Sequence, residues 1–219
     1  MRYDTVIFDL DGTLLNTLDD LAGSVNFAME SCGFPVRTLD EIRCFVGNGI
    51  NILIRRAVPE GTQEEDIDKA FELFKQHYGN NCVVKTRPYD GIMDLLERLS
   101  KVGIKMAIVS NKVDFAVKEL NNRFFKDYIS VAVGECENVR RKPAPDSVNK
   151  ALEQLGSVRE KSLYVGDSDV DIATAENSGM DCVSVSWGFR DRKYLKEKGA
   201  SVIVDAPEKL AEYLLTYNT

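Results

Sequence analysis

Short apolar runs recur along the chain, and most are separated by segments with helical periodicity. Each run contains β-branched residues and is bounded by Gly, Asp or Ser, a pattern typical of buried strands. The runs occupy residues 5–8, 105–110, 129–133, 162–166, 182–187 and 201–204. Alternation of strands and helices predicts an α/β fold: a Rossmann-like, mainly parallel sheet flanked by helices.

Capping residues mark several of the predicted helices. One amphipathic segment ends before Gly103, another starts at Pro145 and Asp146 and stops at Gly156, and a third stops at Gly179. Acidic residues or Pro at the start and Gly after the end are common helix boundaries. These signals predict helices between the strands.

Residues 16–85 break the alternation, because they contain helical patterns and no convincing strand. Thr38 and Thr62 each precede a glutamate by three residues, which is the spacing of a capping box. We therefore predict a helical cap domain at 16–85, inserted into an α/β core domain formed by 1–15 and 86–219.

Composition narrows the function classes. The 219 residues carry a net charge of −7, which argues against a general nucleic-acid or membrane binder. The sequence shows neither a secretory signal nor an apolar run of membrane-spanning length. The five cysteines form no C-x-x-C pair, so a disulfide framework or zinc site is not expected. We expect a cytoplasmic monomer or homodimer.

Polar side chains follow three of the predicted strands. Asp9 and Asp11 follow the first, Ser110 and Asn111 end the second, and an acidic segment at 166–171 follows the fourth. Ligands bind beyond the carboxyl ends of strands in open α/β sheets. Helix capping explains a single Asp or Ser, but explains less well why three strands end this way.

Clustered carboxylates with a single histidine, His77, in the chain favour a hard, oxygen-preferring cation, Mg²⁺ before Zn²⁺. Enzymes commonly use such a cation, held by carboxylates, to bind and polarise a phosphate group. Lys142 lies between Arg141 and two prolines, and is a candidate positive group for a phosphate, although a lysine is more often a surface charge.

Four segments, in order, give the chain a specific resemblance. They are DLDGT at 9–13, SN at 110–111, KPAPD at 142–146 and GDSDVD at 166–171. This set resembles the four motifs of the haloacid dehalogenase-like (HAD) superfamily in its phosphatase form. Three further segments, FVGNG at 45–49, RPYDG at 87–91 and SWGFR at 186–190, resemble phosphoglycolate-phosphatase-type members.

The resemblance implies a role for each acidic residue of the motifs. Asp9 is the expected nucleophile, and Asp11 the general acid that then becomes the base, so Asp11 should hold a proton when substrate arrives. Mg²⁺ is expected to bind Asp9, the Asp11 backbone carbonyl and Asp167, while Asp171 positions the metal or its waters. Asp169 is interpreted as a helix-cap or surface residue.

The resemblance also implies the substrate contacts. Ser110 and Lys142 are expected to hold phosphoryl oxygens, and Gly12 to permit a tight turn toward the phosphate. Thr13 and Asn111 complete this group. In the cap, Gly47, Asn48 and Gly49 are either a turn between helices or a loop that closes over the site. Trp187 is either a packing residue or a substrate contact.

The predicted activity is Mg²⁺-dependent hydrolysis of a small phosphorylated metabolite through an aspartyl-phosphate, with 2-phosphoglycolate as the first choice. Two enzyme alternatives stay open: a phosphatase of a nucleoside monophosphate, pyrophosphate or sugar phosphate, and a phosphoglucomutase-like transferase. A binding module on an inactive phosphatase fold is the non-enzyme alternative.

Overall fold

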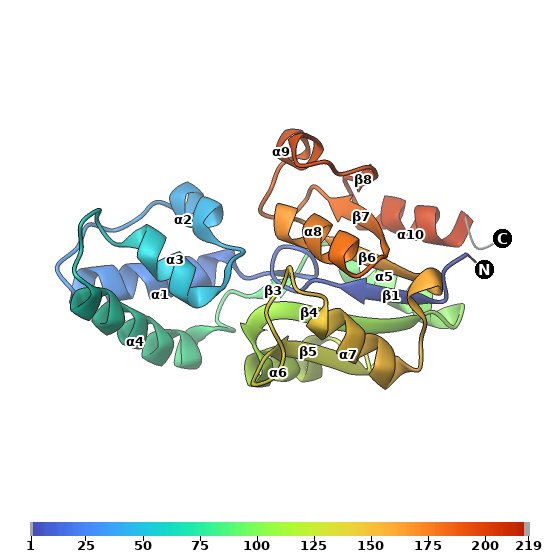
Figure 1. The fold of residues 1–219 in the computed structure, drawn as a ribbon, viewed down its shortest axis with the longest axis horizontal. Helices are drawn as coiled ribbons and strands as arrows, with labels where there is room; N and C mark the ends of the chain where they lie inside the picture. The colour runs from blue at the N-terminus through green and yellow to red at the C-terminus, as the bar shows by residue number, and fades with distance from the viewer. Residues whose placement is uncertain (1, 217–219) are drawn as a thin grey trace. The chain divides into compact units, whose positions relative to one another are not determined.

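The computed structural model describes residues 2–216, which divide into two compact units (Figure 1). One unit contains the chain before Leu15 and after Arg87, and the other contains Leu15–Arg87. The chain therefore leaves the first unit after its first strand and returns just before position 88.

The first unit is built on a six-stranded sheet in the order β5-β4-β1-β6-β7-β8. Each neighbouring pair in this sheet is parallel. Its strands are β1 (Thr5–Phe8), β4 (Lys105–Val113), β5 (Val131–Glu135), β6 (Ser162–Gly166), β7 (Asp181–Val185) and β8 (Ile203–Val204). The predicted mainly parallel sheet flanked by helices is confirmed.

Helices cover the sheet, with α7 and α8 in front of it in Figure 1 and α5 behind. Ile7, Tyr164 and Val109 from the strands pack with Val148 of α7 and Ala175 of α8 in one buried cluster. The helices of this unit are α5 (Ile92–Lys101), α6 (Asp114–Phe124), α7 (Asp146–Leu155), α8 (Asp169–Asn177), α9 (Arg192–Glu197) and α10 (Pro207–Thr216), with a short 3₁₀ helix at Arg159–Lys161. Two layers of helices thus bury both faces of the central strands.

The second unit is helical. It contains α1 (Leu18–Ser31), α2 (Leu39–Phe45), α3 (Gly49–Ala57) and α4 (Glu64–Asn81). The buried carboxylate of Asp20 in α1 accepts hydrogen bonds from the backbone N–H groups of Lys85 and Thr86, which fixes the returning chain. Two-residue strands β2 (Leu15–Asn16) and β3 (Arg87–Pro88) pair where the chain leaves and returns.

Two local predictions for this unit had different outcomes. Thr38 forms the predicted capping box with Glu41 at the start of α2. The predicted capping box at Thr62 was wrong: Gln63 is the N-cap of α4, and the Thr62 hydroxyl instead donates to the Pro59 carbonyl. Residues 16–85 were predicted to contain no strand, but Asn16 belongs to β2. This strand has two residues and is too short to show a period-two pattern in the sequence.

Among residues 2–216, none of the helices is both long enough and apolar enough to cross a membrane. The cysteines that the structure describes are all free thiols.

Candidate active site

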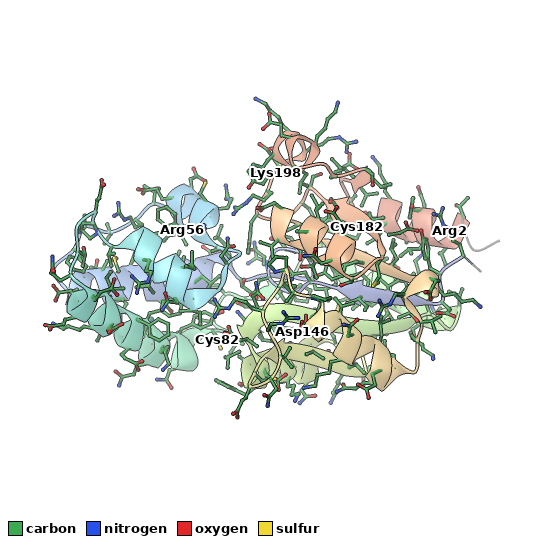
Figure 2. The ribbon with its side chains drawn as sticks, viewed as in Figure 1. Arg2, Arg56, Cys82, Asp146, Cys182 and Lys198 are labelled. Carbon is green, nitrogen blue, oxygen red and sulfur yellow. The ribbon has the colours of Figure 1, made fainter. Side chains whose placement is uncertain are left out.

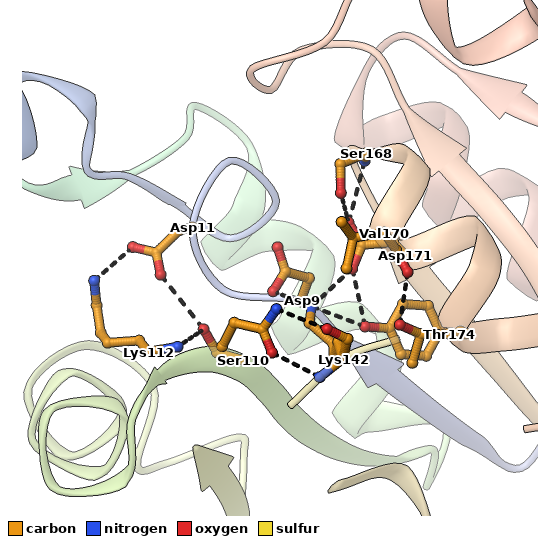
Figure 3. A network of polar contacts seen from close by, with 11 residues as sticks. Asp9, Asp11, Ser110, Lys112, Lys142, Ser168, Val170, Asp171 and Thr174 are labelled. Atoms are coloured by element: carbon orange, nitrogen blue, oxygen red, sulfur yellow. Dashed lines mark hydrogen bonds and ion pairs between the residues drawn. The ribbon is translucent and has the colours of Figure 1, made fainter. Parts of the chain in front are cut away.

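Three neighbouring strands bring the predicted polar residues to one edge of the sheet. Phe8 of β1 is level with Ile108 of β4 on one side and with Val165 of β6 on the other. Asp9 directly follows β1 and Asp167 directly follows β6, while Ser110 lies in β4 three residues before its end. These residues therefore lie at the same end of the sheet, as Figure 3 shows for Asp9 and Ser110. The carboxyl-end rule for open α/β sheets thus placed them correctly relative to the fold.

The Lys142 ammonium lies between two carboxylates. Its Nζ is 2.7 Å from Asp9 Oδ1 and 2.7 Å from Asp171 Oδ1, and the Lys142 side chain is 4% exposed. Lys142 Nζ also donates to the Tyr164 hydroxyl at 3.1 Å. Lys142 is therefore a buried charge beside Asp9 and not a surface charge.

Asp171 uses both carboxylate oxygens within the protein. Oδ1 accepts from Lys142 and from the Tyr164 hydroxyl, while Oδ2 accepts from the backbone N–H and the hydroxyl of Ser168. The contact from the Ser168 N–H belongs to a capping box at the start of α8, in which Ser168 is the N-cap residue and Asp171 the third helical residue. An ionised carboxylate offers about four lone-pair positions, and four donors use them here, so Asp171 is built to orient Lys142 and α8.

Asp167 is enclosed by backbone. The Phe189 N–H donates to Asp167 Oδ2 at 2.6 Å. Gly12 has φ +92°, and a Cβ added there would overlap the Asp167 carboxylate. A glycine is needed at position 12 both for the left-handed backbone and for this close approach.

Burial changes the protonation of these groups. Burial raises the pKa of Asp9 to about 7, although the Lys142 ammonium opposes the shift. Burial, with the neighbouring Asp171 and Asp9, raises the pKa of Asp167 well above its usual range. Burial alone would lower the pKa of Lys142, but Asp171 and Asp9 raise it well above the usual lysine value. With a pKa of about 7, the Asp9 carboxyl is only partly ionised at neutral pH, and a further positive charge at the site would favour its ionised form.

The carboxylates fit a metal ion. Asp9, Asp167 and Asp171 are buried, and each offers one oxygen that lies within 4.8 Å of the oxygens of the other two. Buried carboxylates repel each other and are costly to desolvate, and a divalent cation would offset both costs. Because Asp171 is already saturated by donors, Asp9 and Asp167 are the better candidate ligands. The Asp11 side chain is not part of this cluster.

Asp11 points instead toward two residues of β4. Its Oδ1 accepts from Lys112 Nζ at 2.9 Å, and its Oδ2 is 3.4 Å from the Ser110 hydroxyl (Figure 3). An ammonium donor is complementary to a carboxylate. That Asp11 holds a proton when substrate arrives stays a prediction.

The other predicted site residues of this unit support its loops. Both ends of the Asn111 side-chain amide bond the backbone of Lys142, so Asn111 fixes the lysine. Thr13 is buried, and its carbonyl accepts the indole N–H of Trp187 at 3.0 Å. This hydrogen bond joins the loop of Trp187 to that of Thr13, and a substrate contact by Trp187 stays a prediction. Asp169 lies in the first turn of α8, and Ser168 is the N-cap residue.

Gly47, Asn48 and Gly49 belong to the second unit, at the turn between α2 and α3. Gly47 and Gly49 have φ values of +121° and +80°, which only glycine adopts readily. A substrate contact by this loop stays a prediction. His77 is in the same unit, where its ring stacks on Phe27 and its Nδ1 is 3.0 Å from the Ser24 hydroxyl.

Sequence reasoning missed Lys112, Tyr164, Ser168 and the N–H of Phe189. Period-two alternation could have found Lys112, because residues two apart on a strand share a face and Ser110 was already a candidate. No comparable signal exists for Tyr164, which lies in a strand that is buried throughout. Figure 2 draws the side chains on the ribbon of Figure 1, with Cys182 and Asp146 of the sheet-containing unit labelled.

Comparison with known proteins agrees with this geometry. The family model for haloacid dehalogenase-like hydrolases matches residues 6–185. A phosphoglycolate phosphatase of Aquifex aeolicus is 34% identical over 185 residues, which are 84% of this chain and 85% of that protein. One from Pseudomonas fluorescens is 32% identical over 211 residues, which are 94% of this chain and 77% of that protein.

A solved structure shares nearly the whole fold. It comes from Lactobacillus delbrueckii subsp. bulgaricus and is named a putative phosphoglycolate phosphatase. Its TM-score is 0.94 and its sequence identity 38%, and the match covers 98% of this chain and 99% of that one.

Proposed function

Because the chain belongs to the haloacid dehalogenase-like hydrolase family and is a phosphatase, we propose that it hydrolyses 2-phosphoglycolate with Mg²⁺ as cofactor and Asp9 as nucleophile. The observation that carries the proposal is the position of Lys142, whose ammonium is 2.7 Å from Asp9 and 2.7 Å from Asp171. A phosphoryl group approaching Asp9 meets a buried positive charge that is already fixed in place.

The first step transfers the phosphoryl group to the protein. A carboxylate oxygen of Asp9 attacks phosphorus, and the bond from phosphorus to the ester oxygen breaks. Asp11 gives its proton to that leaving oxygen, which releases glycolate. Ser110 and Lys142 donate hydrogen bonds to phosphoryl oxygens as negative charge redistributes.

The second step regenerates the protein. Asp11, now ionised, takes a proton from water, whose oxygen attacks phosphorus and breaks the bond to Asp9. Inorganic phosphate leaves and the Asp9 carboxylate is restored. Lys112 of β4 holds Asp11 beside the site for both proton transfers, while the single hydroxyl proton of Ser110 turns to the phosphoryl oxygen.

A divalent cation bound by Asp9, Asp167 and the Asp11 backbone carbonyl would supply positive charge to the phosphoryl oxygens. The chain's own residues prepare that site. Phe189 orients Asp167 through its backbone N–H, and Asp171 orients Lys142 beside Asp9. The choice of Mg²⁺ follows from an all-oxygen ligand set.

The choice of 2-phosphoglycolate is supported by the relatives at 30–34% identity, which carry that activity in their names. Asp9, Asp167 and Lys142 act on the phosphoryl group, which every phosphomonoester carries. Discrimination among phosphomonoesters therefore depends on residues that meet the rest of the substrate.

The test is release of inorganic phosphate from 2-phosphoglycolate and from an aryl phosphate. Asp9→Asn should lower kcat/KM for both substrates by at least about 10³-fold, because the nucleophile is lost. Asp169→Asn makes the same chemical change two positions before Asp171, and should retain activity.

Retained turnover in Asp9→Asn would contradict the nucleophile assignment. Phosphate that appears on a second hydroxyl, and not as the free ion, would point to a transferase. Full activity in excess chelator would contradict the metal requirement.

A further inference from the structure

Lys112 is a buried ammonium that the phosphoryl chemistry above does not require as a donor to phosphate. It lies in β4 two residues after Ser110, and its side chain is 6% exposed. Its backbone N–H donates to the Ser110 hydroxyl at 3.1 Å, which fixes the chain there. Its Nζ is 2.9 Å from Asp11 Oδ1 (Figure 3).

In the proposed mechanism, the contact with Asp11 puts Lys112 on the leaving-group side of the site. Lys142 contacts Asp9, the residue that attacks phosphorus, whereas Lys112 contacts Asp11, the residue that protonates the leaving oxygen. The general acid must come within hydrogen-bond distance of the leaving oxygen. An ammonium that touches this acid is therefore close to whatever is attached to that oxygen.

The site as described has four carboxylates, Asp9, Asp11, Asp167 and Asp171, and Lys142 is already shared by two of them. A substrate with an anionic leaving group adds negative charge beside the leaving oxygen, where Asp11 acts, whereas Lys142 contacts Asp9 and Asp171. In 2-phosphoglycolate the carboxylate is on the carbon that carries the ester oxygen, within about 4 Å of that oxygen at ordinary bond lengths. Lys112 is placed to meet this charge.

The positive charge of Lys112 attracts a substrate carboxylate while its Nζ stays in contact with Asp11 Oδ1. The two roles support each other, because the same ammonium aligns the acid with the leaving group that the acid protonates.

We propose that Lys112 binds a carboxylate on the leaving group of the substrate, and so selects phosphomonoesters of 2-hydroxy acids over those of neutral alcohols. This inference rests on the proposed phosphatase mechanism and makes its substrate class specific. Arg190 is a second cation near the cluster of carboxylates. Its guanidinium lies over the Tyr194 ring, and its charge acts on Asp167, where it opposes the rise in the pKa of that carboxyl.

The experiment compares two substrates that differ at one position. The first is 2-phosphoglycolate, and the second is 2-hydroxyethyl phosphate, in which a neutral hydroxymethyl group replaces the carboxylate. The ratio of their kcat/KM values isolates recognition of the carboxylate, since any disturbance of Asp11 affects both substrates. Ratios are measured with Mg²⁺ for the wild type, Lys112→Met, Lys112→Gln and Lys112→Arg.

The expected wild-type ratio favours 2-phosphoglycolate. Lys112→Met should reduce that ratio by at least about tenfold, mainly through a higher KM for the carboxylate-bearing substrate, because a charged partner is lost. Lys112→Arg keeps the charge and should retain part of the preference. Lys118→Met, which removes an exposed lysine paired with Asp114 on α6, is the matched control and should leave the ratio unchanged.

Lys112→Gln keeps a polar end at Asp11, so it gives a second reading if the methionine variant does not fold. An unchanged ratio in the folded Met or Gln variant would overturn the role of Lys112 while the phosphatase mechanism stands. If the ratio of kcat/KM values falls in Arg190→Gln and not in Lys112→Met, the carboxylate is bound by Arg190 and the role proposed for Lys112 is wrong.

Two outcomes separate this inference from the proposed substrate. If the wild type rejects 2-phosphoglycolate but prefers 2-phospholactate to its neutral analogue, and loses that preference in Lys112→Met, the role of Lys112 stands and the proposed substrate is wrong. A folded wild-type protein that releases phosphate from none of these compounds would overturn both.

Discussion

Gly188 lies directly against Gly12. A Cβ added at position 188 would overlap both the Gly12 carbonyl oxygen and the Asp167 side chain. The residues on either side of Gly188 reach the same two segments: Trp187 donates to the Thr13 carbonyl, and Phe189 donates to Asp167. The loop after β7 therefore holds the first catalytic loop and a candidate metal ligand at a fixed separation.

We predict that Gly188→Ala separates these segments. The added Cβ would overlap a backbone oxygen, which cannot move aside without shifting the whole loop. We therefore expect kcat/KM to fall at least about tenfold, and half-maximal activity to require a higher Mg²⁺ concentration. Titration of phosphatase activity with Mg²⁺ measures both effects. Gly23→Ala is the control, because a Cβ at that helical position meets nothing within 4 Å. Equal Mg²⁺ requirements in the two variants would contradict the prediction.

Asp171→Asn should affect stability and activity together. An asparagine can accept from Lys142 and Tyr164 through its carbonyl, but its amide nitrogen cannot accept from the Ser168 N–H and hydroxyl. Leaving those buried donors unsatisfied costs about 1–3 kcal/mol of unfolding free energy, which urea denaturation measures. Activity should also fall because Lys142 loses one of its two charged partners. Asp169→Asn, on the same helix turn, should change neither value; a similar loss there would argue against a specific role.

The stability of the protein in chelator should depend on pH through Asp9. Folding raises the pKa of Asp9 to about 7, so the folded state binds a proton more tightly than the unfolded state does. The stabilisation is complete below the ordinary carboxyl pKa and is lost as pH rises through about 7. Thermal unfolding in chelator should therefore show a lower Tm at pH 8 than at pH 5. Asp9→Asn should show a smaller decrease; an identical decrease would assign the effect to other groups.

Mg²⁺ should stabilise the protein more at pH 8 than at pH 5. Metal binding requires deprotonated carboxylates, and burial raises the pKa of both Asp9 and Asp167. A saturating ligand raises Tm in proportion to the logarithm of its concentration over its Kd, so the Mg²⁺-induced shift in Tm reports affinity. The shift should shrink in Asp9→Asn at pH 8. A shift that is independent of pH would place the ion at another site.

The two threonines at the predicted capping boxes should differ in their effect on stability. Thr38→Ala removes a hydroxyl that caps α2, and should lower the stability of the helical unit by about 1 kcal/mol. Thr62→Ala removes a hydroxyl at a position that is not the N-cap of α4, and should lower the free energy of unfolding by less. Hydrogen exchange of the α2 and α4 amides compares the two variants, and equal costs would mean that the capping geometry is unimportant here.

Much of the sheet could be predicted because its central strands are buried on both faces. In the sequence, β1 and β6 are short, largely apolar runs, and the polar residues Asp9 and Asp167 mark where they end. The helix α6 was not predicted, because it begins where β4 ends and the sequence shows no boundary between them. Two-residue strands such as β2 carry no period at all.

The supporting contacts of the site were harder to predict than its carboxylates. The role of Asp171 as a capping residue depends on the Ser168 side chain turning back to it, although the Ser-x-x-Asp spacing was visible. The contact from Phe189 to Asp167 comes from a backbone N–H, which every residue type except proline provides. Such a contact depends on where the chain runs in space, and the sequence around position 189 does not encode it locally.

The Tyr89 N–H donates to the Leu14 carbonyl at 3.1 Å, so the two ends of the helical unit leave the sheet side by side. Because these two ends meet, a replacement for residues 15–87 whose ends lie equally close would leave β1 and β4 paired in the same register. Asp9 and Lys142 both lie outside the helical unit. Insertions and deletions between positions 15 and 87 can therefore accumulate in evolution without moving these two charged groups apart.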